Sequence, residues 1–122
     1  MPFDWREFLA LAKALQQSPP TSCSIEAAQR SAVSRAYYAA FCYLRNYAEN
    51  HLGFHRTRTG KDHSLLREHL KTRGSPWDVL AENLEELLQW RHLCDYDDMV
   101  GNLNLITLGA IATAKDIIDI CS

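Results

Sequence analysis

The stretch from Leu80 to Asp98, LAENLEELLQWRHLCDYDD, constrains the fold most, because its apolar residues recur at helical spacing. One face of a helix would carry Leu80, Leu84, Leu87 and Leu88, which is the pattern of a helix packed against a core. The same face continues into Arg91, Cys94 and Asp95. Since Arg91 and Asp95 are four residues apart, a helix places their charges one above the other. Such a pair either closes the end of a bundle or belongs to a functional site.

Helical patterns also cover the rest of the chain, and no segment alternates as a β-strand would. The start signals are Asp4 with Glu7 as a capping box, Ser24, Asp62, and Ser75 with Pro76. The stop signals are Ser18-Pro19-Pro20, Gly53 and Gly74. They predict helices over residues 4–18, 24–51, 62–73, 75–95 and 99–121. We therefore expect residues 1–122 to form one all-α domain, an antiparallel bundle of four to five helices.

The last predicted helix is apolar on more than one face. Its large apolar residues are Leu103, Leu105, Ile106, Leu108, Ile111, Ile117, Ile118 and Ile120. A helix of this kind is either central in its own bundle or shared with a second subunit. We expect a homodimer whose interface includes the fourth or fifth helix.

Several features bear on where the protein resides. No run approaches the ~18 apolar residues of a membrane span, and the opening MPFDWREF lacks the apolar block of a signal peptide. The four cysteines lie far apart without a C-x-x-C pair, and the three that fall inside helical patterns are typical of small buried residues in a reducing compartment. We expect a cytoplasmic protein that does not enter the membrane.

Charge is distributed unevenly along the chain. The net charge of −2 argues against a dedicated nucleic-acid binder, yet residues 51–73 hold six Lys and Arg against Asp62 and Glu68. Residues 74–122 hold nine acids against Arg91 and Lys115. The basic segment is suited to an anionic partner, and the phosphate contacts would come from Arg56, Arg58 and Lys61.

Two parts of the chain resemble HEPN domains, which are small helical bundles of prokaryotic toxin–antitoxin modules, often found beside a minimal nucleotidyltransferase. The first is RSAVSRAYYAAFCYLRNYAE, in which Ser34 to Phe41 is the most diagnostic piece. The second is DHSLLREHL together with the later LLQWRHLCDYDD. The resemblance runs from about Ser24 to Asp98, in order and spacing.

The resemblance implies a ribonuclease motif, which this chain carries in altered form. Active members have an Arg, a polar residue and then a His five to seven positions after the Arg, and two such sites face each other in a dimer and cut RNA without metal. Arg91 matches the arginine and His92 its polar neighbour. The positions of the distal His hold Tyr96, Asp97 and Asp98. The chain therefore resembles a variant branch of the family.

The candidate site residues follow from the chemistry of RNA cleavage, which needs a base, an acid and a cation for the phosphorane charge. Arg91 would hold phosphate bidentately, His92 would act as base or acid, Asp95 would orient them, and Tyr96 would donate to phosphate or stack on a base. Further phosphate contacts are assigned to Arg35, Arg56, Arg58, Lys61 and His63. We expect no cofactor and no metal, since His51 and His55 have ligand spacing but lack a third ligand.

The sequence is compatible with three functions. The first is a HEPN-type toxin-like protein that cuts RNA, a metal-independent endoribonuclease with its site at a dimer cleft. The second is a non-catalytic HEPN module that binds nucleotide or RNA and partners a minimal nucleotidyltransferase. The third is an interaction domain whose last helix is the interface.

Overall fold

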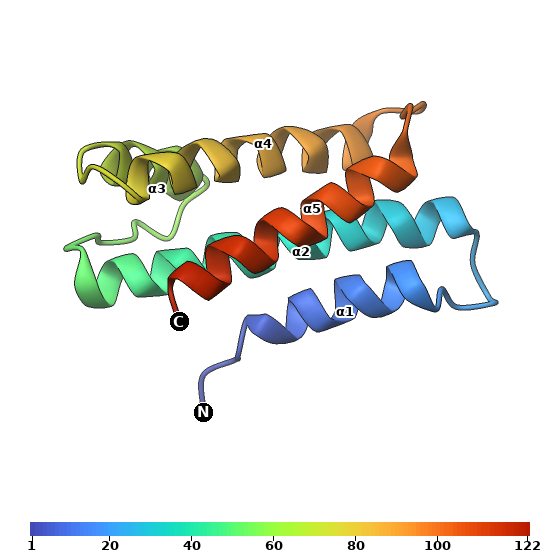
Figure 1. The fold of residues 1–122 in the computed structure, drawn as a ribbon, viewed down its shortest axis with the longest axis horizontal. Coiled ribbons are helices and arrows are strands. Elements are labelled where there is room, and N and C mark those ends of the chain that lie inside the picture. The colour runs from blue at the N-terminus through green and yellow to red at the C-terminus, as the bar shows by residue number, and fades with distance from the viewer.

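The computed structural model describes all residues 1–122 and contains five α-helices and no β-strand (Figure 1). The helices are α1 (Arg6–Gln17), α2 (Ile25–His51), α3 (Asp62–Lys71), α4 (Trp77–Tyr96) and α5 (Leu103–Ile120). The four long helices run in alternating directions, with the short α3 inserted between α2 and α4 (Figure 1). The predicted all-α antiparallel bundle is confirmed.

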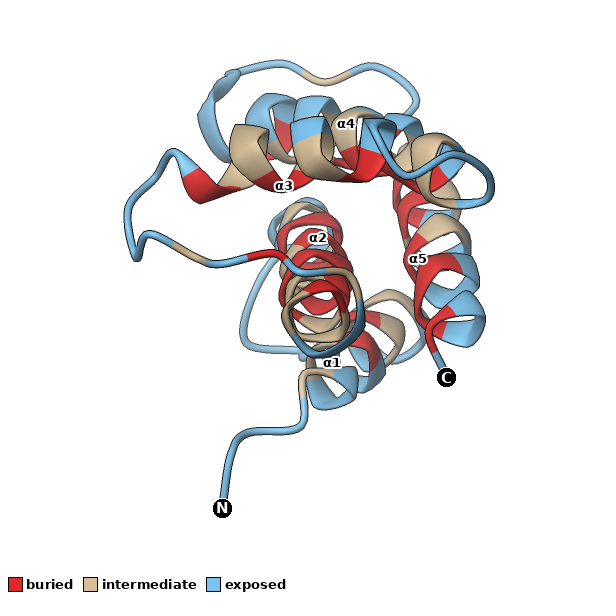
Figure 2. Cartoon of the chain, turned by 90° about the vertical axis from the view of Figure 1, so that its left-hand side faces the viewer, coloured by how far each residue is buried: buried red, intermediate tan, exposed pale blue.

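α2 is the central helix, because α1, α4 and α5 all pack against it (Figure 2). At 27 residues it is about 40 Å long. Its core face is an apolar stripe at helical spacing, and each of Val33, Ala36, Tyr37, Ala40, Phe41, Leu44 and Ala48 is at most 4% exposed. The alanines on this face carry little side-chain volume, so neighbouring helix backbones approach α2 closely.

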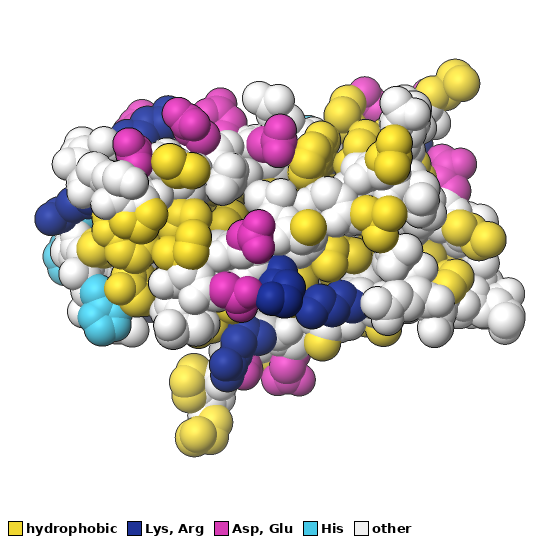
Figure 3. All heavy atoms as spheres, viewed as in Figure 1, with side chains coloured by type: hydrophobic (Ala, Val, Ile, Leu, Met, Phe, Trp, Pro, Cys, Tyr) yellow, Lys and Arg dark blue, Asp and Glu magenta, His cyan; other side chains and the backbone are white.

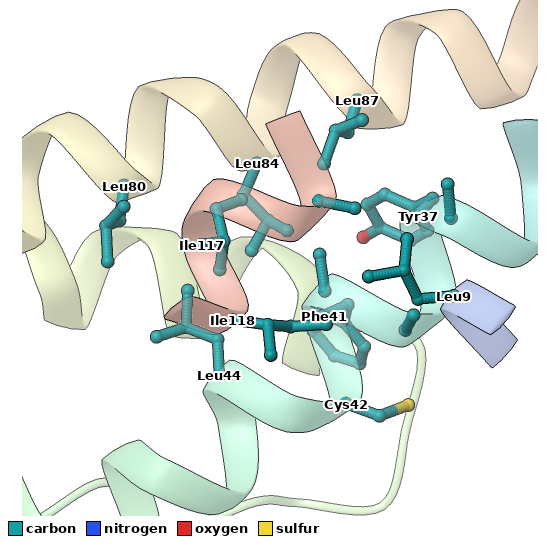
Figure 4. Packing of buried hydrophobic residues seen from close by; sticks show 14 of the residues in the cluster. Leu9, Tyr37, Phe41, Cys42, Leu44, Leu80, Leu84, Leu87, Ile117 and Ile118 are labelled. Atoms are coloured by element: carbon teal, nitrogen blue, oxygen red, sulfur yellow. The ribbon is translucent and has the colours of Figure 1, made fainter. Parts of the chain in front are cut away.

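The leucine face of α4 is buried as predicted at three of its four leucines, while Leu88 is half-buried at the edge of the core. Leu80, Leu84 and Leu87 are no more than 1% exposed, and Leu84 and Leu87 lie above the Tyr37 and Ile117 side chains of α2 and α5 (Figure 4). Burying each leucine side chain contributes about 1.5–3 kcal/mol to the free energy of folding. This packing fixes the rotation of α4 about its axis, and therefore which residues of its last turns point inward.

The predicted helix starts at Asp4, Ser75 and Met99 are wrong. The predicted cap at Ser24 is confirmed, because its side chain accepts a hydrogen bond from the Ala27 N–H. Asp4 does not form a capping box with Glu7; its carboxylate accepts from the backbone N–H of Arg6, the first residue of α1. α4 begins at Trp77, so Pro76 precedes the helix instead of opening it.

α5 begins at Leu103 and not at Met99. Arg30 of α2 explains part of this difference, because its guanidinium donates to the carbonyls of Asp97 and Asp98 and holds them in a loop. Asn102 then adopts a left-handed φ of 56°, which a continuous helix does not allow.

The outer face of α5 carries exposed apolar residues, as predicted, beside the exposed charges of Lys115, Asp116 and Asp119. Leu105, Leu108 and Ile120 are 67%, 44% and 48% exposed, and Figure 3 shows apolar side chains between scattered charges on the face that carries α5. None of the five helices combines the length and apolar character that crossing a membrane requires.

Candidate functional site

The Arg91–Asp95 pair lies where the sequence predicts it, at the end of the buried face of α4. Arg91 Nε donates to Asp95 Oδ2 over 3.0 Å, and the side chains are 12% and 29% exposed. Burial is the largest influence on the Arg91 guanidinium and lowers its pKa, but the hydrogen bond to Asp95 and electrostatic attraction to Tyr38, Asp95 and Tyr96 together keep that pKa above its ordinary value. No protein acceptor binds the terminal nitrogens of Arg91, so its two terminal NH2 groups remain for an anion.

Two tyrosines of α2 form the floor beneath this guanidinium. The Cζ atom of Arg91 lies 5.6 Å from the ring centroid of Tyr37 and 5.1 Å from that of Tyr38. These cation–π contacts hold the arginine against α2, so its position is set by two helices.

His63, the second residue of α3, packs against the same part of α2. Its ring stacks on Phe41 with the centroids 4.2 Å apart, and its Nδ1 lies 2.5 Å from the Tyr37 hydroxyl oxygen. Burial raises the pKa of Tyr37, so the phenol keeps its proton. Burial also lowers the pKa of His63, with further lowering from the charges of Arg91 and Arg67, so the imidazole is neutral at pH 7.

The Tyr37–His63 hydrogen bond determines what the other imidazole nitrogen does. When Nδ1–H donates to Tyr37, Nε2 carries a lone pair and is a base; when the Tyr37 O–H donates to Nδ1, Nε2–H is a donor. Nε2 has no hydrogen-bond partner in the protein. We refer to Tyr37, Tyr38, His63, Arg91 and Asp95 as the Arg91–His63 cluster.

The four predicted catalytic residues separate into two pairs on different faces of α4. Arg91 and Asp95 face α2, whereas His92 and Tyr96 are exposed on the outer face, with ring centroids 6.1 Å apart. Tyr96 is 71% exposed. Within one chain, the imidazole brought to Arg91 is therefore His63 and not His92.

A basic groove adjoins the cluster. It is a cavity of about 680 Å³ between α1, α2 and the loop before α3, and Tyr38 and His63 belong to both the groove and the cluster. Its wall contains four arginines and several aromatic rings, namely Arg35, Arg45, Arg56, Arg58, Trp5, Phe8, Tyr38 and Phe41. We call it the Arg35–Arg45 groove.

Asp62 shapes the loop that borders this groove. Its buried carboxylate accepts hydrogen bonds from the N–H and hydroxyl of Thr57 and from the N–H of Arg58. Burial opposes the charge of this carboxylate, but these hydrogen bonds outweigh it and hold the pKa of Asp62 below its ordinary value. Arg58 has a left-handed φ of 63°, and this network holds it there.

The residues predicted to bind phosphate are not equivalent. Arg35, Arg58 and His63 line the groove. Arg56 also lines it, but its guanidinium is paired with Glu49. Lys61 is exposed and lies outside the groove wall.

Sequence reasoning missed three groove residues, Arg45, Trp5 and Phe8. The signal for Arg45 is present in α2, because Arg35, Tyr38 and Arg45 recur at offsets of three and seven residues and so share one helical face. The two aromatic residues of the α1 segment carry no such signal, since they read equally well as core.

No three His, Cys, Asp or Glu side chains gather as the ligands of a metal ion would. Searches with this chain against protein-family models, curated proteins and solved structures find no match.

Proposed function

We propose that this protein is a HEPN-type, toxin-like endoribonuclease that cuts RNA without metal at the Arg91–His63 cluster. The observation that carries the proposal is that Arg91 and the neutral imidazole of His63 both contact Tyr37. Burial lowers the pKa of His63, and the charge of Arg91 lowers it further. A cation for phosphate and a base that is neutral at pH 7 are two of the three groups that the reaction needs. The proposal also rests on the resemblance of the chain to HEPN domains.

In the proposed reaction, Arg91 binds the non-bridging oxygens of a phosphodiester through its two free terminal NH2 groups. Nε2 of His63 takes the proton of the 2′-hydroxyl, and the 2′-oxygen attacks phosphorus. The bond from phosphorus to the 5′-oxygen breaks, and this oxygen leaves after taking a proton, for which we assign His92. The products are a 2′,3′-cyclic phosphate and a 5′-hydroxyl, so no water or metal-bound hydroxide is consumed.

The proposed assembly is a homodimer. Leu105 and Leu108 on α5 and Leu93 and Tyr96 on α4 are exposed apolar groups near the end of α4 that carries Arg91. A dimer formed there would shield these residues and bring His92 and Tyr96 of each copy to the border of a shared cleft. Several exposed apolar residues that lie close together are typical of an interaction surface.

A second candidate function is a non-catalytic module that binds nucleotide or RNA and partners a minimal nucleotidyltransferase. Asp95 favours it, because the carboxylate already neutralises Arg91 across 3.0 Å and α4 lacks the distal histidine. In this case the cluster binds a phosphate without turnover.

Analysis of the RNA ends separates the two functions. The purified full-length protein is incubated with RNA in EDTA, and the fragments are tested for 2′,3′-cyclic phosphate and 5′-hydroxyl ends. Such ends, absent with the His63→Ala protein, support the ribonuclease. Intact RNA that nevertheless binds to the protein supports the binding module.

A further inference from the structure

The Arg35–Arg45 groove carries positive charge that the protein does not neutralise. Arg35, Arg45 and Arg58 line it, and none of them forms an ion pair with a carboxylate. Asp62 is the one acid in the wall, and both of its oxygens already accept hydrogen bonds from Thr57 or Arg58. A groove with three uncompensated guanidinium groups, on a chain of net charge −2, is suited to an anion.

Two of these guanidinium groups are fixed on neighbouring aromatic rings. The Cζ of Arg35 lies 4.7 Å from the Phe8 centroid, and that of Arg45 lies 5.8 Å from the Trp5 centroid. The Trp5 and Phe8 rings lie edge to face with their centroids 5.3 Å apart, so the two arginine–ring contacts adjoin each other along the groove wall.

Asn46 holds Arg45 from the other side. Its side-chain oxygen accepts hydrogen bonds from Arg45 Nη2 at 3.0 Å and from Arg56 Nη2 at 2.8 Å. Burial, and to a lesser degree the charge of Arg56, lowers the pKa of Arg45, so a bound anion would relieve an unfavourable environment. The arginines are ordered in advance of binding, which lowers the entropic cost of binding an anion.

The groove continues into the Arg91–His63 cluster. Tyr38 forms a wall of the groove, and its ring lies 5.1 Å from the Cζ of Arg91. His63 likewise contributes to both. A nucleic-acid strand with one phosphate at Arg91 would therefore extend along the aromatic wall toward Arg35.

We propose that the Arg35–Arg45 groove is a nucleotide subsite, in which the two arginines bind a phosphate and the aromatic wall of Trp5 and Phe8 stacks a base. Arginine planes lying on aromatic rings are surfaces on which bases stack, and a volume of about 680 Å³ is within the range of small-ligand sites. The groove binds a nucleotide whether or not the proposed function holds. The position of this nucleotide next to the scissile bond rests on the proposed function.

Calorimetric titration of the full-length protein in EDTA tests the subsite with three probes: 5′-AMP, adenosine and inorganic phosphate. We expect 5′-AMP to bind more tightly than either part alone. Replacing Arg35 and Arg45 together by Gln should weaken 5′-AMP binding by at least about tenfold, because two charged contacts to the phosphate are lost. The matched control is Arg73→Gln, on an exposed arginine in the turn after α3, and it should leave binding unchanged.

Two results would overturn the subsite: equal affinity for 5′-AMP and phosphate, or an affinity for 5′-AMP that the double replacement leaves intact. If the double variant does not fold, Arg58→Gln tests the subsite instead, since Arg58 is exposed and its side chain has no protein partner. The Arg58→Gln protein should bind 5′-AMP about threefold more weakly than the wild type.

Arg91→Ala distinguishes this inference from the proposed function. It should leave 5′-AMP binding within about twofold while RNA cleavage is lost. A wild-type protein that binds 5′-AMP through Arg35 and Arg45 but leaves RNA intact would uphold the subsite and refute the ribonuclease. A protein that cuts RNA but does not bind 5′-AMP would support the ribonuclease and refute the subsite.

Discussion

The hydroxyl oxygen of Tyr37 lies 2.5 Å from Nδ1 of His63, so a phenol of α2 orients an imidazole of α3. Tyr37→Phe removes this partner and leaves a half-buried nitrogen without a hydrogen bond, which should cost about 1–3 kcal/mol. We expect a melting temperature several degrees lower and slower RNA cleavage, because His63 is no longer held in one tautomer. Thermal unfolding followed by circular dichroism measures the first effect and a cleavage assay the second.

Tyr43→Phe is the matched control for that change. Tyr43 is also on α2, but its hydroxyl meets the hydroxyl of Ser122 at an exposed position. Tyr43→Phe should change neither the melting temperature nor the rate of RNA cleavage appreciably. Equal effects from the two replacements would contradict the assigned role of Tyr37.

The environment of His63 predicts how stability depends on pH. Burial lowers the pKa of His63, Arg91, Arg67 and His92 lower it further, and Asp62 opposes them, so the folded pKa lies below the ordinary 6.5. The unfolded chain therefore binds the proton first as the pH falls. Stability should be full above pH 6.5 and should decrease as the pH falls from 6.5 toward the folded pKa of His63.

An NMR titration of the His63 ring tests this prediction. Arg91→Ala removes one positive charge, so the pKa of His63 should rise toward 6.5 while remaining lowered by burial. Cleavage by the wild type should lose rate at acidic pH along the same titration curve, since a protonated imidazole is no base. A His63 pKa above 6.5 in the wild-type protein would contradict the proposed role of this residue as a base.

Arg30 ties α2 to the end of α4 that carries the cluster. Its guanidinium donates to the carbonyls of Cys94, Asp97 and Asp98 at 3.0, 2.6 and 3.1 Å. Arg30→Ala should lower the free energy of unfolding by about 2 kcal/mol, because the part-buried carbonyl of Cys94 and two exposed carbonyls lose a charged donor. Amide hydrogen exchange should accelerate at the end of α4.

Glu26→Gln is the control for Arg30, since it removes only the exposed ion pair of Glu26 with the same guanidinium. It should cost less than about 0.5 kcal/mol. A comparable loss of stability in both proteins would mean that Arg30 acts through its ion pair and not through the carbonyls.

The exposed apolar face of α5 predicts self-association. Replacing Leu105 and Leu108 together by Glu should convert a dimer into a monomer in sedimentation experiments at micromolar concentration, since a stable interface buries about 1,000 Å² or more. Leu11→Glu, at an equally exposed position of α1, should leave the dimer intact. A wild-type monomer under these conditions would refute the homodimer.

Helical periodicity predicted the fold because each core face is a local property of the sequence. The buried residues of α2 and the leucines of α4 follow from spacing alone, and so does the Arg91–Asp95 pair. The helix starts at Arg6, Trp77 and Leu103 were not predicted; at Leu103 the reason is that Arg30, from elsewhere in the chain, holds the carbonyls of the preceding loop.

The site was less predictable because its parts come from different helices. His63 was singled out as a phosphate ligand, but its contact with Tyr37 spans 26 residues and has no local signature. Arg56 looked free in a basic loop, yet Glu49 neutralises it. Trp5 and Phe8 became part of the groove only because α1 packs beside Arg35 and Arg45 on α2.

The stability of Arg91→Ala must be known before its activity is interpreted. The guanidinium makes one hydrogen bond to Asp95 and two cation–π contacts, whose loss should cost about 1–2 kcal/mol and leave the fold intact. If the arginine were purely structural, replacing both Arg91 and Asp95 by Leu would restore stability, since an apolar pair suits the leucine face.

The single-turnover rate of RNA cleavage in EDTA, compared between wild type, Arg91→Lys and Arg91→Ala, tests the central claim most directly. The two variants should each lose at least about a hundredfold in rate, because lysine keeps the charge but not the bidentate fork. The exposed control Arg73→Ala should cut RNA at the wild-type rate. A folded Arg91→Ala protein that cuts RNA as fast as the wild type, or a wild type that leaves RNA intact, would contradict the account.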